Sequence, residues 1–112
     1  MSTMTNQAYS ALGQMIGGYL HQDMDLIAES VPEAIAVFAR ETDEAGKQAL
    51  RRDMQAFIAD HGANAEAEFA ARYGGDFHPS EIGQTVKEFF AMVDVLLERP
   101  DAWTDFDRRN GE

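Results

Sequence analysis

The chain has 112 residues, of which 20 are Asp or Glu and 9 are Lys or Arg, so its formal net charge at pH 7 is −11. The length fits one domain, and a hydrophobic fraction of 45% is typical of a globular protein rather than of a disordered chain. The acidic excess argues against direct binding of nucleic acid or of an anionic membrane, which need clustered basic residues, and the absence of cysteine excludes disulfides and thiolate chemistry.

The first predicted helix follows Thr5 or Asn6, either of which is suited to cap it. Its apolar residues recur every three or four positions, as on one face of an amphipathic helix. They are Ala8, Tyr9, Leu12, Met15, Ile16, Tyr19 and Leu20. Gly17 and Gly18 each cost about 1 kcal/mol relative to alanine inside a helix. Because the stripe continues past them, we expect the helix to run on, with the glycines allowing close packing; the alternative is a loop from which Tyr19 docks.

Two further helices have recognisable starts. Ser30 and Glu33 fit a capping box, and the helix that they begin is predicted to end at Arg40. Its buried stripe consists of Val31, Ala34, Ile35 and Phe38. Thr42 is predicted to cap the next helix, which should end before Gly62, a residue type favoured just beyond a helix C-terminus. Its inward-facing residues are predicted to be Ala49, Leu50, Met54, Phe57 and Ile58.

The second half of the chain predicts a short helix, a loop and a long helix. Asn64 is expected to cap the short helix, which ends before Gly74. This helix carries Phe69 and Tyr73. Residues 76–79 are expected to form a loop, because the residue before a proline avoids helical geometry. Ser80 is predicted to cap the long helix, which Pro100 ends. Its apolar stripe is Ile82, Val86, Phe89, Phe90, Val93, Leu96 and Leu97.

The tail at 101–112 carries Trp103 and Phe106 among charged residues, so it either frays or docks through at least Trp103. No window alternates between apolar and polar residues as a strand does, so no sheet is expected. We predict an all-α protein: a single domain over residues 1–112, built as a compact bundle of about five helices.

One segment, 17–25, concentrates polar groups able to do chemistry. His21 and Asp25 would share a helix face, and together with Asp23 they suggest a small metal-dependent hydrolase as an alternative function. The other histidines, each beside an aspartate in the pairs Asp60–His61 and Asp76–His78, have no recognised metal-ligand spacing. We therefore expect no catalytic residue, no metal and no cofactor.

The acidic residues are unevenly distributed. Before Asp23 the chain has no charged side chain, and from Asp23 to Glu33 it has four acids and no base. These four residues, called here the predicted acidic patch, are Asp23, Asp25, Glu29 and Glu33. A patch of one sign attracts a complementary partner and accelerates association. It is therefore the candidate partner-binding surface.

Residues 15–25, Met-Ile-Gly-Gly-Tyr-Leu-His-Gln-Asp-Met-Asp, resemble the signature of the contact-dependent growth inhibition immunity proteins. The matching residues, called here the family motif, are Gly18, Tyr19, His21, Gln22, Asp23 and Asp25. Leu20 stands where the family usually has an aromatic residue and Met24 where it has tryptophan. Residues 30–35 are similar to the helix start that follows in the family, and 73–79 are faintly similar to the loop before its last helix.

The resemblance implies a small helical protein that binds the C-terminal toxin domain of a cognate effector and blocks it by stoichiometric binding, without catalysis. It implies a mainly structural role for the family motif. An acidic surface would suit a toxin with a basic active-site cleft. A second alternative is a DNA mimic that inhibits a DNA-binding protein, although the pairs Arg51-Arg52 and Arg108-Arg109 interrupt the required rows of carboxylates.

The expected location is the cytoplasm. Residues 1–6 lack the basic and apolar regions of a signal peptide. No apolar run approaches the roughly 20 residues that a membrane-spanning helix needs. The oligomeric state is left open by the sequence.

Overall fold

The computed structural model describes residues 9–20, 30–75 and 77–106, and within these ranges every regular element is helical. The α-helices are α1 (Ser10–Tyr19), α2 (Val31–Glu41), α3 (Glu44–His61), α4 (Ala65–Tyr73) and α5 (Val86–Glu98). Short 3-10 turns lie at η3 (Gly62–Asn64), η4 (Pro79–Ile82) and η5 (Pro100–Ala102). The prediction of an all-α fold with about five helices is confirmed.

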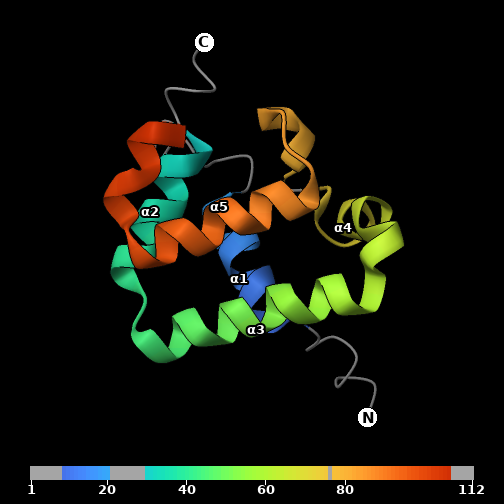
Figure 1. Cartoon of the computed structure of the whole chain (residues 1–112), viewed down its shortest axis with the longest axis horizontal. Helices are drawn as coiled ribbons and strands as arrows, with labels where there is room; N and C mark the ends of the chain where they lie inside the picture. Colours follow the sequence, from blue (N-terminus) through green and yellow to red (C-terminus); the bar gives the residue numbers. More distant parts are fainter. Residues whose placement is uncertain (1–8, 21–29, 76, 107–112) are drawn as a thin grey trace.

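The long helices frame the molecule. Figure 1 shows α5 crossing the middle of the view, with α3 along the lower side, α2 at one end and α4 at the other. Helix α1 lies behind α5, where it contacts both α2 and α3. Each helix thus presents its apolar stripe to a shared interior, as the periodicity of the sequence predicts.

The core is richest in aromatic rings between α3, α4 and α5. Phe69 of α4 lies with its ring centroid 6.1 Å from that of Phe57 on α3 and 5.9 Å from that of Phe89 on α5, both in edge-to-face geometry. Phe77, which follows α4, packs 5.1 Å from Phe89. All four rings are at most 2% exposed. Such pairs contribute about 0.5–1.5 kcal/mol each beyond the burial of their area.

Helix α1 begins at Ser10, later than expected, and Thr5 and Asn6 lie outside the described residues. Its first amides are satisfied from another helix: the N–H groups of Ala11 and Leu12 donate to one carboxylate oxygen of Asp53 on α3, at 2.8 and 3.1 Å. The Asp53 side chain, 42 residues from Ala11 along the chain, therefore takes the place of a local N-cap. No pattern at the start of the helix reveals such a partner.

The prediction that α1 continues through its two glycines is confirmed, since the helix extends to Tyr19. Gly17 and Gly18 are both exposed. The expected close packing is not seen at Gly18, where an added Cβ atom would meet no atom of the described residues within 4 Å apart from its chain neighbours and its own helix backbone. Continuation is instead explained by the burial of Leu12, Met15 and Ile16 on the opposite stripe.

Helix α2 starts as predicted, with the Ser30 hydroxyl accepting from the Glu33 amide at 3.3 Å, and ends one residue beyond Arg40. The prediction that Thr42 caps α3 is wrong. The Asp43 carboxylate caps α3 by accepting from the Gly46 amide at 2.9 Å. The Thr42 hydroxyl instead donates to the Phe38 carbonyl at 2.6 Å, which closes the end of α2. Of these two neighbouring residues, Thr42 therefore closes the end of α2 and Asp43 caps the start of α3.

Helix α3 ends at His61, as expected. Gly62, however, has φ −29° and ψ −58°, so it does not use the left-handed conformation that favours glycine after a helix. The chain tightens into η3, which leads directly into α4. Asn64 occupies the position before α4, but its side chain makes no capping hydrogen bond.

The predicted start of α5 at Ser80 is wrong, because Ser80 lies within η4 and α5 begins six positions later at Val86. Gly83, with φ 73°, ends η4 in a left-handed conformation. Thr85 and Glu88 then form a capping box, with bonds of 2.9 and 3.1 Å. The Thr-x-x-Glu pattern at 85–88 was the available signal for this start. The predicted end before Arg99 and Pro100 is confirmed.

The segment after α5 folds back onto the body. Trp103 and Phe106 pack against the core, so the predicted docking of Trp103 is confirmed. Asp101 accepts from the Arg40 guanidinium at 2.9 Å, which joins this segment to α2. Residues 107–112 lie outside the described part of the chain.

We predict that Asp53→Ala lowers the free energy of unfolding by about 1–3 kcal/mol, because two amides at the start of α1 lose a charged acceptor. Urea denaturation monitored by circular dichroism measures this loss. Asp105→Ala is the matched control, since Asp105 is exposed and its side chain has no hydrogen bond or ion pair among the described residues. Equal stability of the two variants would contradict the capping role of Asp53.

Candidate functional site

The structure describes only the beginning of the family motif. Gly18 and Tyr19 end α1, and Leu20 follows with 2% of its surface exposed. The remaining motif residues and three members of the predicted acidic patch lie outside the described residues. They are His21, Gln22, Asp23, Asp25 and Glu29.

Tyr19 joins the end of α1 to the end of α2. Its hydroxyl donates to a carboxylate oxygen of Glu41 at 2.7 Å, and its ring meets that of Phe38 edge-to-face at 5.2 Å. The hydrogen bond to Glu41, with burial as the second cause, raises the pKa of Tyr19. These contacts give Tyr19 a packing role.

Tyr9 anchors the other end of α1 in the same way. Its hydroxyl donates to Asp60 on α3, and its ring lies 5.3 Å from Phe57 and 5.0 Å beneath the Arg72 guanidinium. Burial, followed by the hydrogen bond to Asp60, raises the pKa of Tyr9 to about 12. Two phenols thus hold the short helix α1 at its two ends.

The other polar residues singled out in the sequence have structural surroundings. Glu33, a member of the predicted acidic patch, lies half-buried in the first turn of α2. His61 packs its ring 5.2 Å from Phe57, and His78 precedes η4, where its amide donates to Glu81 at 3.3 Å. Within 9–20, 30–75 and 77–106, no cluster of three His, Asp or Glu side chains is arranged to hold a metal ion. Among the described helices, none combines the length and apolarity needed to cross a membrane.

Two hollows flank α5, and the sequence patterns indicated neither of them. The first, called here the acidic groove, has a volume of about 720 Å³ and lies between η4, α5 and Phe106. Its lining residues include Glu81, Ile82, Gln84, Glu88, Met92 and Val95. The second, called here the α3–α5 groove, has a volume of about 500 Å³. Its lining residues include Arg51, Met54, Ile58, Lys87, Phe90 and Asp94.

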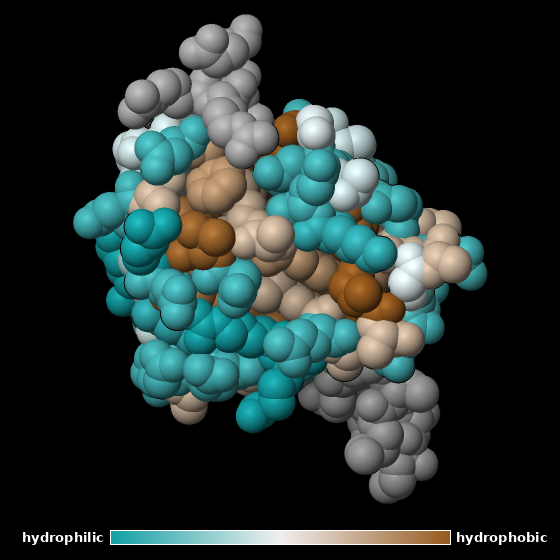
Figure 2. All heavy atoms as spheres, in the orientation of Figure 1, coloured by the Kyte–Doolittle hydropathy of each residue, from teal (hydrophilic) through white to brown (hydrophobic). Residues whose placement is uncertain are grey.

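Ala91, exposed on α5, lines both grooves and so connects them. Figure 2 shows apolar surface gathered across this face of the molecule, with hydrophilic side chains on both sides. A connected apolar surface with a polar border is typical of a site where a protein binds another molecule. The face is therefore a second candidate site, besides the predicted acidic patch.

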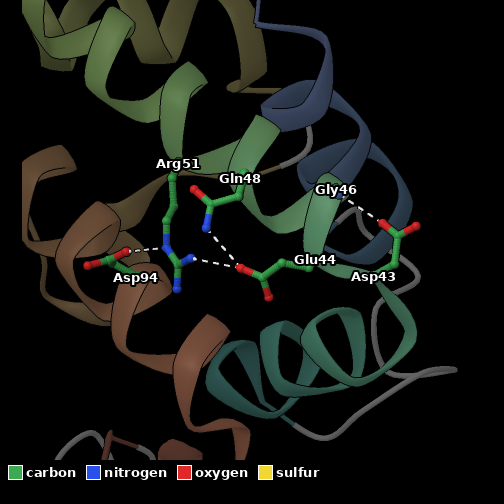
Figure 3. Close-up of polar contacts among 6 residues, drawn as sticks. All are labelled: Asp43, Glu44, Gly46, Gln48, Arg51 and Asp94. Carbon is green, nitrogen blue, oxygen red and sulfur yellow. Dashed lines mark hydrogen bonds and ion pairs between the residues drawn. The ribbon is translucent and has the colours of Figure 1, made fainter.

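The two grooves differ in charge. Among the residues that the structure describes, the lining of the acidic groove has two carboxylates, Glu81 and Glu88, and no lysine or arginine. The α3–α5 groove has Arg51 at its edge, and Figure 3 shows this guanidinium between Asp94 of α5 and Glu44 of α3. The distances are 2.8 Å to Asp94 and 3.9 Å to Glu44, and Gln48 donates to Glu44 at 2.9 Å. Of the two grooves, the acidic groove is therefore the one whose described lining residues carry negative charge without a base.

We predict that the tyrosines ionise at higher pH in the native protein than in the chain unfolded by urea, because the fold favours the neutral phenol at all three. Burial raises the pKa of Tyr73 as well. The stabilisation of the fold by the neutral phenols is complete below pH 10, the ordinary pKa of tyrosine. It is lost as the pH rises through the pKa that each phenol has in the folded protein, which is about 12 for Tyr9. Ultraviolet titration of phenolate measures this, with Tyr9→Phe removing the last step. Coincident native and unfolded titration curves would contradict these contacts.

The two grooves give the described part of the chain surfaces suited to binding. Comparison with known proteins points the same way. A family model described as CdiI immunity protein matches residues 8–97, which include the whole family motif and the groove-lining residues other than Phe106. No curated protein and no solved structure matches the chain at a significant level. Because the match covers most of the sequence, the chain belongs to the CdiI immunity protein family.

Proposed function

We propose that this protein binds the C-terminal toxin domain of a cognate contact-dependent growth inhibition effector in the cytoplasm and neutralises it as a stoichiometric complex. The observation that carries the proposal is the family match over residues 8–97. The resemblance of residues 15–25 to the family signature supports the same conclusion. The protein acts by occupying a surface of the toxin rather than by a reaction of its own.

The charge of the chain supports a particular mode of inhibition. With a net charge of −11 the protein is suited to a toxin whose active-site cleft is basic, as clefts that bind nucleic acid are. An acidic surface placed over such a cleft excludes the substrate and accelerates the encounter. Complexes between DNases and their immunity proteins are among the tightest formed by any two proteins, so inhibition by binding alone is sufficient to silence a toxin.

Co-expression with the toxin domain encoded directly upstream of this chain is the test. We expect the chain to restore growth to cells that produce the toxin domain and to co-purify with it in a fixed ratio. A toxin domain from an unrelated system serves as the control and should be neither neutralised nor bound. Failure of both rescue and co-purification with the cognate domain would overturn the proposed function.

A second prediction concerns the predicted acidic patch as a binding surface. Asp23→Lys, Asp25→Lys and Glu29→Lys are combined with Glu33→Gln, because glutamine also suits the third position of a helix that begins after a serine cap. We expect association with the toxin domain to slow by about tenfold at low salt, and by less at high salt, because steering by charge is screened. Stopped-flow fluorescence measures the association rate.

The control for this variant is wild-type protein across the same range of salt concentrations. Circular dichroism establishes that the variant retains its helical content. An association rate equal to that of wild type at low salt would remove the patch from the interface, while leaving the proposed function itself intact.

A further inference from the structure

The surface over α5 has the composition of the centre of a protein interface. Of the residues that line the two grooves, Ile58, Ala91, Val95 and Phe106 are apolar and at least partly exposed. They come from α3, from α5 and from the segment after it. Burial of connected apolar area at the centre of a patch, within a polar border, is the usual source of affinity between proteins.

The acidic groove adds two carboxylates whose internal partners are few. Glu81 accepts from the His78 amide at 3.3 Å, and Glu88 accepts from the Thr85 amide at 2.9 Å. Both side chains belong to exposed residues. A carboxylate offers about four acceptor positions, so each retains capacity for a cationic donor. Among residues 9–20, 30–75 and 77–106, no lysine or arginine lines the groove to take that place.

Gln84, which lies in the wall of the same groove, has an unsatisfied amide. Its Nε2 reaches only the Met92 sulfur, at 3.7 Å, and its buried Oε1 has no hydrogen-bond partner in the described part of the chain. A thioether is a weak acceptor, so exchanging the two amide atoms would leave the side chain equally poorly paired. Buried amides are normally hydrogen-bonded. The Gln84 amide therefore retains hydrogen-bonding capacity beside the groove.

We infer that the acidic groove receives a lysine or arginine side chain of the toxin domain, and that Ala91 lies at the centre of the interface. This inference rests on the proposed function. Lysine and arginine have an apolar stem and a cationic end, which match Ile82, Met92 and Val95 along the groove and the carboxylates of Glu81 and Glu88. Neighbouring residues of the toxin domain then cover Ala91 and extend into the α3–α5 groove.

The charge is tested by the double variant Glu81→Gln/Glu88→Gln, measured with a catalytically inactive form of the upstream toxin domain. Glutamine keeps the oxygen that accepts from His78 and Thr85, so the local turns are preserved while two charges are removed. We expect the dissociation constant to rise by about tenfold or more, mainly through faster dissociation.

The matched control is Glu41→Gln/Glu98→Gln, which removes the same net charge outside both grooves. Its glutamine at 41 still offers an acceptor to Tyr19, and Glu98 is exposed, with no hydrogen bond or ion pair from its side chain among the described residues. We expect less than about a threefold change for this control, since charges outside an interface act mainly through screened, long-range steering. Equal effects of the two double variants would overturn the assignment of a basic side chain to this groove.

The central position is tested by Ala91→Arg, which places a bulky cation between the grooves without lowering helix propensity much. Its control is Ala67→Arg, at an exposed site on α4 that lines neither groove. We expect Ala91→Arg to weaken binding by about a hundredfold and Ala67→Arg by less than about threefold, as for residues inside and outside an interface centre. Thermal unfolding verifies that both variants are folded.

The outcomes separate the two proposals. If wild-type protein fails to bind the toxin domain, the proposed function and this inference both fall. If wild type binds and Ala91→Arg binds equally well, only the surface over α5 is overturned. If Ala91→Arg is weakened but Glu81→Gln/Glu88→Gln is not, the cationic occupant is overturned.

Discussion

Phe69 reaches from α4 into the space between α3 and α5, with its ring 6.1 Å from that of Phe57 and 5.9 Å from that of Phe89. Helix α4 spans only Ala65–Tyr73, and a helix of that length is marginal on its own in water. Packing of this ring therefore holds α4 in place and sets the spacing of α3 and α5. Helix α5 buries Phe89 on its inner side and presents Ala91 between the two grooves on its outer side. The position of this outer surface therefore depends on the spacing of α3 and α5.

Carboxylates serve two purposes in this molecule, and the distinction gives meaning to the acidic excess. Asp53 caps α1, Asp43 caps α3, and Glu66 accepts from the Val86 amide at the start of α5 at 2.8 Å. These acids satisfy amides that a helix N-terminus leaves open, and they also interact favourably with its dipole. Their negative charge still counts toward the field of the protein. Part of the net charge of −11 therefore comes from carboxylates that cap helices. Glu88, in contrast, lines the acidic groove, where its side chain is exposed.

Agreement between sequence and structure is closest where the deciding interactions are local. Ser30 caps α2 as predicted because its partner, the Glu33 amide, is three residues away. Predictions were wrong where several local signals competed. Ser80 and Thr85 both suit the start of a helix, and only Thr85 has a glutamate three residues later and lies beyond the left-handed Gly83. The groove residues escaped prediction because they come from separate elements, and Val95 belonged to no predicted stripe.

By itself, the sequence determined the all-α class, the order of the helices, most of their buried stripes and the resemblance to a family, since each rests on spacing or on short strings of residues. Tertiary structure decided how α1 begins and which side of α5 remains exposed. The physical reason is distance along the chain. The carboxylate of Asp53 meets Ala11 across 42 positions, and Phe106 and Ile82 come to line one groove with Val95, although no periodicity relates residues so far apart.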